Sequence, residues 1–293
     1  MKSINYVNFA SGRLWTEAFG DPSSPLVVLV MGTTKQAVYW RASLCDALAR
    51  RGYYVVRYDH RDTGLSTHIN FNASPYRLGD LTYDLRAIIE YYDSARQGAH
   101  LVGCGMGGYL AQELAINAPE FIKSLVLLMS TYSAVPIEHP WGIHDLPSTP
   151  QEVLDQIEYV GRILPHDPNW FDKTMQIMKI LNGADAPFDE EEWASLVDEL
   201  RARINYEQAP AFFHHHLLAK TLSKLSFESN RIKQPTLIVH GSVDPIIPIE
   251  HAFATHEIIP NSKLVIINNM GHALPKVFYP AFIDAVNEHW DVM

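Results

Sequence analysis

Six short runs of large aliphatic and β-branched residues recur along this chain of 293 residues, and amphipathic segments separate them. The runs occupy residues 26–31, 53–58, 100–103, 125–129, 236–240 and 264–267. Continuous apolar runs of this length are typical of parallel strands in a sheet that is covered on both faces. Helical spacing is found at residues 42–51, 78–92, 106–117, 250–257 and 278–290. This alternation predicts an α/β fold with a mostly parallel central sheet flanked by helices.

Two parts of the chain depart from this alternation. Residues 4–9 and 13–19 alternate between polar and apolar side chains, which predicts an antiparallel hairpin before the first parallel strand. Residues 136–230 contain no apolar run of strand type. We therefore expect one α/β core made of residues 1–135 and 231–293, with residues 136–230 inserted as a helical lid (cap). The candidate lid helices are residues 150–164, 169–181, 189–204 and 209–224.

Charge and composition exclude several classes of protein. The net charge is −10 and no basic stripe is present, which argues against a nucleic-acid partner. The start of the sequence lacks the apolar run of a signal peptide, and no apolar segment is long enough to cross a bilayer. Two cysteines, Cys45 and Cys104, cannot form a disulfide framework, and we interpret both as reduced. The expectation is a cytoplasmic protein without a membrane partner.

The segment from Gly103 to Gly107 has the frame of a nucleophile elbow, G-x-S-x-G, after a predicted strand. In this motif a serine occupies a sharp strand-to-helix turn. Here Gly105 stands at the serine position, so no hydroxyl is available for acyl transfer. Cys104 precedes the turn, and we expect its side chain to be packed away from the site. The frame G-x-G-x-x-G is also met, but no acidic strand end follows about twenty residues on, so a nucleotide-binding oxidoreductase is not favoured.

Other candidate residues follow other predicted strands. Asp244 comes after the run at 236–240 and is the candidate acid, and His272 comes after the run at 264–267 and is the candidate base. The backbone N–H groups of Thr33 and Met106 would form an oxyanion hole. Since the carboxyl ends of parallel strands meet at one sheet edge, these groups should lie together. The order elbow, acid, histidine is the order of this class of hydrolase.

The chain resembles α/β-hydrolases along nearly its whole length, and within them the methylesterases of aclacinomycin-type aromatic polyketides. The motifs that carry this resemblance are Arg57 to Gly64 with Ser66, Val30-Met31-Gly32, Asp244-Pro245-Ile246 and Met270 to Pro275. It implies carboxylic ester hydrolysis on a small, largely apolar ester-like ligand, with no metal and no organic cofactor. It also places the serine of those enzymes on Gly105, and suggests that Asp59 or Arg61 orients backbone near the oxyanion turn.

Three explanations for Gly105 stay open. The residue could replace a natural serine, in which case the chain as it stands is near-inactive in acyl transfer. The pair His272–Asp244 could instead act as a general-base dyad on water or on an acidic C–H, as in a lyase or a decarboxylation. Finally, the chain could be a ligand-binding pseudoenzyme. A separate feature, the run His214-His215-His216, does not predict a metal site, because consecutive helical side chains point about 100° apart.

Overall fold

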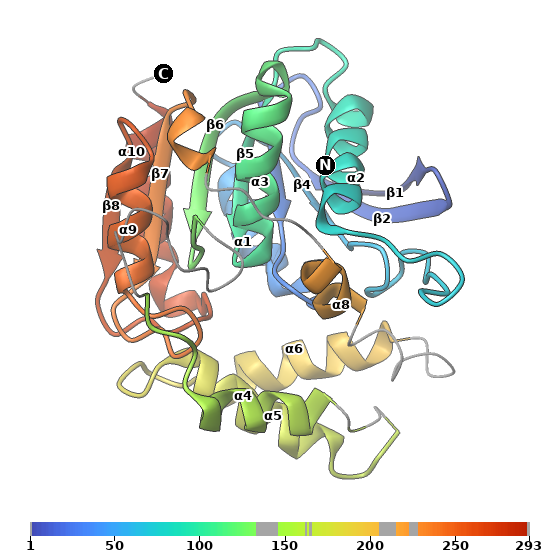
Figure 1. Cartoon of the computed structure of the whole chain (residues 1–293), viewed down its shortest axis with the longest axis vertical. Coiled ribbons are helices and arrows are strands. Elements are labelled where there is room, and N and C mark those ends of the chain that lie inside the picture. Colours follow the sequence, from blue (N-terminus) through green and yellow to red (C-terminus); the bar gives the residue numbers. More distant parts are fainter. Residues whose placement is uncertain are drawn as a thin grey trace.

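The computed structural model describes residues 2–132, 146–161, 163, 166–204, 215–222 and 228–291. Within these residues, eight strands form one sheet in the order β1-β2-β4-β3-β5-β6-β7-β8 (Figure 1). The pairs β1·β2 and β2·β4 are antiparallel, and the other neighbours are parallel. The strands are β1 (Lys2–Phe9), β2 (Gly12–Phe19), β3 (Leu26–Val30), β4 (Tyr54–Tyr58), β5 (Ala99–Cys104), β6 (Ile122–Leu128), β7 (Thr236–Gly241) and β8 (Lys263–Ile267).

Helices cover both faces of the sheet, and each face has its own apolar cluster. On one face pack α2 (Leu78–Tyr92), α3 (Met106–Asn117) and α9 (Glu250–Ile258). On the other face lie α1 (Ala42–Ala49) and α10 (Tyr279–Trp290). The central strands β3, β4 and β5 are buried along their whole length, as their continuous apolar composition predicts. The short helices are η1 (Ala37–Tyr39), η2 (Pro119–Phe121), η3 (Glu228–Arg231) and η4 (Lys276–Phe278).

The predicted α/β fold with a mostly parallel sheet is confirmed, and so is the opening hairpin. One strand differs from its prediction, because β6 begins at Ile122, three residues before the apolar run. Lys123 and Ser124 interrupt the apolar pattern there. Ser124 is nevertheless fully buried, since its Oγ atom pairs with His100 Nδ1 at 2.8 Å and accepts from Trp290 Nε1 at 3.1 Å. A buried polar residue whose hydrogen bonds are made within the fold cannot be recognised as part of a strand from the hydrophobicity pattern alone.

The described α-helices between β6 and β7 are α4 (Gln151–Gly161), α5 (Trp170–Asn182), α6 (Glu190–Ala202) and α8 (His215–Leu222). In Figure 1, α4, α5 and α6 lie across the end of the sheet toward which β6 points. Side chains of α5 and α6 form a third apolar cluster, which also includes Val38 of η1. The predicted helices at 150–164, 169–181 and 189–204 match α4, α5 and α6, whereas parts of the fourth and of the start of the lid fall outside the described residues. The division into core and lid stays a prediction.

No helix in the described ranges has both the length and the apolar composition needed to cross a membrane.

Candidate active site

The turn between β5 and α3 has the tight geometry of an elbow. Gly105 forms the turn with φ 53° and ψ −117°, and α3 begins at the next residue. A Cβ atom on Gly103 would lie 2.5 Å from the carbonyl oxygen of Gly107, and one on Gly107 would overlap the carbonyl of Val30. These two glycines therefore allow backbone to contact backbone. A Cβ on Gly105 would be 3.8 Å from His272 Nε2 and 3.9 Å from Gly32 Cα, which is ordinary contact. Position 105 thus has room for a side chain.

The candidate base and acid lie together beside this turn. His272 Nδ1 is 2.8 Å from Asp244 Oδ2, and the carboxyl group of Asp244 is buried. Burial raises the pKa of Asp244, but the attraction of His272 and its hydrogen bond outweigh it, so the pKa lies below its usual value. Because an ionised carboxylate only accepts hydrogen bonds, Nδ1 carries the proton. In the neutral form of the imidazole the lone pair is then on Nε2, the atom nearest to a Cβ on Gly105.

Asp244 is held in place by the backbone of its own loop. Its Oδ1 atom accepts hydrogen bonds from the N–H groups of Ile246 and Ile247, at 2.8 and 2.9 Å. These two bonds leave Oδ2 for His272. The loop after β7 therefore presents one carboxylate oxygen to the imidazole and uses the other to keep its own shape.

The loop after β3, which contains Thr33, is held by two histidines. His60 Nε2 pairs with the carbonyl of Met31 at 2.9 Å. On the other side of Thr33, the N–H of Thr34 donates to His216 Nδ1 at 3.0 Å. Burial lowers the pKa of both imidazoles to about 4, so both are neutral near pH 7. His216 then carries its proton on Nε2, which donates to the carbonyl of Arg61 at 2.8 Å.

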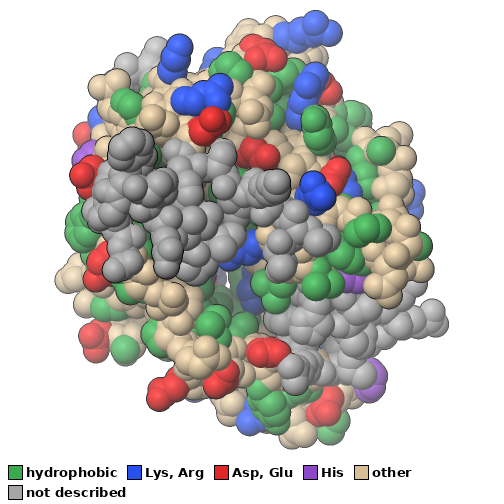
Figure 2. Space-filling view, in the orientation of Figure 1, with side chains coloured by type: hydrophobic (Ala, Val, Ile, Leu, Met, Phe, Trp, Pro, Cys, Tyr) green, Lys and Arg blue, Asp and Glu red, His purple; other side chains and the backbone are tan. Residues whose placement is uncertain are grey.

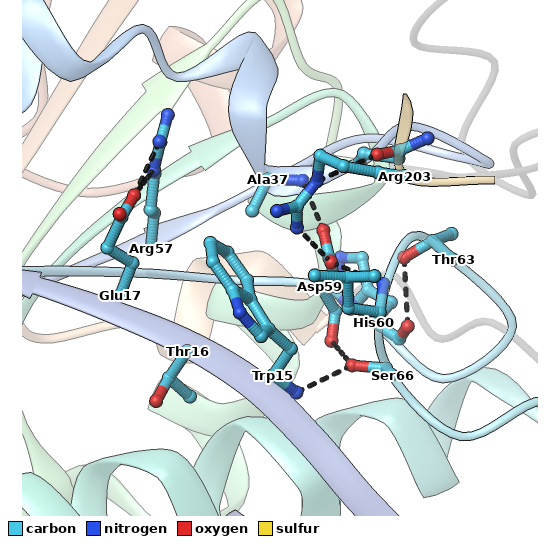
Figure 3. Close-up of polar contacts among 12 residues, drawn as sticks. Trp15, Thr16, Glu17, Ala37, Arg57, Asp59, His60, Thr63, Ser66 and Arg203 are labelled. Atoms are coloured by element: carbon cyan, nitrogen blue, oxygen red, sulfur yellow. Dashed lines mark hydrogen bonds and ion pairs between the residues drawn. The ribbon is translucent and has the colours of Figure 1, made fainter. Parts of the chain in front are cut away.

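Asp59 holds the same loop further along the chain (Figure 3). Its Oδ1 atom accepts from the N–H of Ala37 at 2.7 Å, which agrees with the role that the resemblance suggests for Asp59. Its Oδ2 atom accepts from Arg203 Nη2 at 2.6 Å. The same Oδ2 atom accepts from the N–H of Leu65 at 2.9 Å. The guanidinium of Arg203, which follows α6, lies 4.0 Å from the ring centre of Trp15. Asp59 therefore joins the loop after β3 to the end of α6.

A cavity of about 990 Å³ lies against these groups. Gly105, His272, Thr33 and Met106 line it, together with residues of α4, α5, α6 and α8. Figure 2 shows this face of the molecule hollowed near its centre, with atoms of Lys or Arg visible in the hollow. Much of the remaining lining is aromatic or apolar, and includes Met31, Tyr39, Trp40, Tyr109, Met129, Tyr132, Ile177, Leu181, Trp193 and Leu196. The structure thus brings together the candidate residues from the loops after β3, β5, β7 and β8.

Cys104 does not supply the missing nucleophile. Its side chain is 3% exposed and belongs to the apolar cluster that contains Val102 and Leu128. Burial raises the pKa of the thiol to about 12, and the nearby negative charge of Asp244 adds to the shift. The thiol is therefore protonated near neutral pH and is a poor nucleophile.

Several residues at this site escaped the sequence analysis. Lys35 and Lys220 line the cavity, and Arg203 holds Asp59. Lys35 could have been predicted to lie at the site, because it is two residues beyond Thr33. Nothing in the sequence around Arg203 or Lys220 indicates that these residues lie there. From the sequence alone the histidine run is considered only as a possible metal site, and its contacts with Asp62 and Thr34 are not predicted. His214 lies outside the described residues, while His215 Nδ1 is 3.0 Å from Asp62 Oδ2 and His216 holds Thr34.

Comparison with known proteins gives the family. The model of the alpha/beta hydrolase fold matches residues 25–277. The rhodomycin D methylesterases DauP of Streptomyces sp. strain C5 and DnrP of Streptomyces peucetius are 29% and 28% identical over 284 residues, covering 94% of both chains in each case. A pimeloyl-(acyl-carrier protein) methyl ester esterase of Nitrosomonas europaea is 30% identical over 184 residues, which is 61% of this chain and 65% of that protein.

Solved structures agree on the architecture. The esterase EaEST from Exiguobacterium antarcticum superposes with a TM-score of 0.76 at 20% identity, covering 97% of this chain and 98% of that one. A bromoperoxidase from Bacillus anthracis has a TM-score of 0.73 at 22% identity, with 100% and 99% of the two chains covered. At these identities the likeness extends to the fold alone. Because the family model matches residues 25–277, which is most of the chain, the chain belongs to the α/β-hydrolase fold family.

Proposed function

We propose that the cavity binds a small, largely apolar carboxylic ester, and that this is a methylesterase-type site whose nucleophile position is occupied by Gly105. The observation that carries the proposal is the position of His272 Nε2, which is 3.8 Å from a Cβ built on Gly105. A hydroxyl attached to that Cβ would be within hydrogen-bond reach of a base already oriented by Asp244. The N–H groups of Thr33 and Met106 are the proposed oxyanion donors. The similarity to two methylesterases supports the ester class.

The missing hydroxyl sets the expected activity. Without a nucleophile, no acyl-enzyme forms, and His272 can act only on water or on the ligand itself. Loss of the serine alone costs about a million-fold in turnover in another triad enzyme, and the residual acceleration comes from the oxyanion hole and from binding. We therefore expect the chain as it stands to be near-inactive toward esters.

Restoring the hydroxyl tests this proposal. The variant Gly105→Ser should hydrolyse p-nitrophenyl acetate at least about a hundredfold faster than the parent chain, because nucleophile, base and acid are then complete. Gly105→Ala is the matched control, since it adds the Cβ atom without the hydroxyl and should gain nothing. The double variant Gly105→Ser/His272→Ala should lose the gain. A Gly105→Ser protein with unchanged circular dichroism and no gain in hydrolysis would contradict the proposal.

A second candidate function is a non-hydrolytic dyad enzyme, of the lyase or decarboxylation type. It is favoured by the intact His272–Asp244 pair, whose Nε2 atom faces the open side of Gly105. Such a dyad would remove a proton from an acidic C–H of the bound ligand. Exchange of deuterium from solvent into the methyl group of 2-acetylnaphthalene, lost in His272→Ala, would support this candidate. Binding without exchange, unaffected by His272→Ala, would favour a ligand-binding pseudoenzyme.

A further inference from the structure

Two lysines in the cavity have no acidic partner among the described residues. Lys35 lies in the loop after β3 and Lys220 lies on α8, and both line the cavity. The other cation of the lining, Arg41, is paired with Glu199 at 2.7 Å. The buried acid of the lining, Glu192, accepts from the backbone N–H of Lys276 at 3.1 Å. The other acid of the lining, Glu158, is exposed on α4. In the residues that the structure describes, neither Lys35 nor Lys220 forms an ion pair with a carboxylate.

Burial of the two amines, with no acidic partner in the part of the chain that the structure describes, lowers the pKa of both. Burial lowers the pKa of Lys35 to about 8, and burial also lowers the pKa of Lys220. A charged group removed from water without a counter-charge is unfavourable. Lys35 makes a cation–π contact, with its Nζ atom 5.3 Å from the ring centre of Tyr39. Such a contact offsets part of the cost of removing the charge from water.

We propose that the ligand of this cavity carries an anionic group, such as a carboxylate or a phenolate, on an aromatic body, and that Lys35 binds this group, with Lys220 as a second cation of the same cavity. The inference rests on the proposed ester site and adds the chemical class of its ligand. The aromatic body is indicated by the rings of the lining, which include Tyr39, Tyr109 and Trp193. A charge-assisted hydrogen bond to an anion would satisfy an amine that is otherwise desolvated without a partner.

The position of Lys35 in the chain strengthens this assignment. It lies two residues beyond Thr33, in a loop that the backbone contacts of Thr34 and Ala37 hold in place. The N–H of Lys35 itself donates to the carbonyl of Gly32 at 3.3 Å. The ammonium therefore extends from a fixed stretch of backbone next to the proposed oxyanion turn, as a group that orients a ligand must.

Equilibrium dialysis of two matched probes tests the inference without any catalysis. The probes are 2-naphthoate and its neutral analogue 2-acetylnaphthalene, measured against the unmodified chain. We expect naphthoate to bind at least about tenfold more tightly, because only the anion pairs with the amines. Lys35→Met should abolish this preference while leaving the affinity for acetylnaphthalene within about twofold. Lys220→Met should weaken the preference. The control Lys263→Met removes a lysine exposed on β8 and should leave the preference unchanged.

Equal affinity for the two probes, no measurable binding of naphthoate, or an unchanged preference in Lys35→Met would each overturn the inference. These outcomes are separate from the test of the ester site, because hydrolysis of the neutral p-nitrophenyl acetate by Gly105→Ser does not require an anion-binding lysine. A chain that gains hydrolysis in Gly105→Ser yet shows no anion preference would keep the proposed function and lose this assignment.

Discussion

The three glycines of the elbow differ in whether packing excludes a side chain. At Gly103 and Gly107 a Cβ atom would collide with backbone, so close packing of β5, α3 and β3 requires the absence of a side chain. At Gly105 the nearest atoms would be 3.8 Å away, so packing does not require glycine. Its φ of 53° lies in the left-handed region, where a side chain adds strain but is tolerated at functional turns. Side-chain packing therefore does not explain the glycine at position 105.

This difference predicts two distinct stability changes. Gly105→Ala should lower the free energy of unfolding by about 1–2 kcal/mol, through the positive φ alone. Gly107→Ala should lower it by about 3 kcal/mol or more, because the new methyl group overlaps the carbonyl of Val30. In an ordinary helix the second change would stabilise by about 1 kcal/mol. Urea denaturation of both variants checks the order, and a Gly107→Ala protein as stable as the parent would contradict the packing argument.

At the scale of elements, the helices between β6 and β7 hold the loop that carries Thr33. Arg203, at the end of α6, pairs with Asp59, which binds the N–H of Ala37. His216 of α8 binds the N–H of Thr34. The position of the proposed oxyanion turn thus depends on where α6 and α8 pack, and not only on the sheet.

The ion pair between Arg203 and Asp59 should therefore contribute far more to the unfolding free energy than an exposed ion pair does. Arg203→Met leaves the fully buried carboxylate of Asp59 without its counter-charge, and we expect a loss of about 3 kcal/mol or more in unfolding free energy. Arg231→Met is the matched control, because Arg231 and its partner Glu228 are 57% and 51% exposed and should contribute less than about 1 kcal/mol. Equal losses in the two variants, measured by urea denaturation, would refute the coupling of α6 to the loop.

Local patterns in the sequence were enough to predict most of the sheet, the helices α2 and α3, and the loops that bring Asp244 and His272 together. Each of these depends on the spacing of neighbouring residues and on the rule that parallel strands end at one edge. The roles of Arg203 and His216 could not be predicted, because their partners are 144 and 182 residues away along the chain. Those contacts are set by how α6 and α8 pack, which local periodicity does not encode.

At the scale of the whole molecule, the stability should depend on pH through buried neutral histidines. Burial lowers the pKa of His60, His100 and His216 to about 4, from an ordinary value near 6.5. The unfolded chain takes up protons at these residues below about pH 6.5, and the folded chain does so only near pH 4. Their contribution to stability is therefore complete above about pH 6.5 and is lost as the pH falls toward 4.

One variant isolates this effect from the carboxylates that titrate in the same range. His100→Gln removes one such imidazole and keeps a polar partner for Ser124. The difference in unfolding free energy between parent and variant should be constant above pH 7. Between pH 6 and 4.5 the parent should lose about 1.4 kcal/mol of unfolding free energy, relative to the variant, for each unit by which the pH falls. Urea denaturation across this range measures it, and a difference independent of pH would show that His100 titrates normally in the folded protein.

The proposed function requires that His272 and Asp244 activate a hydroxyl at position 105. Reaction of Gly105→Ser with phenylmethanesulfonyl fluoride, followed by mass spectrometry of the digest, tests it most directly. We expect one sulfonyl group on the peptide that contains position 105, and none in Gly105→Ala or in Gly105→Ser/His272→Ala. A folded Gly105→Ser protein that stays unmodified, or one that is modified equally without His272, would contradict this role of His272.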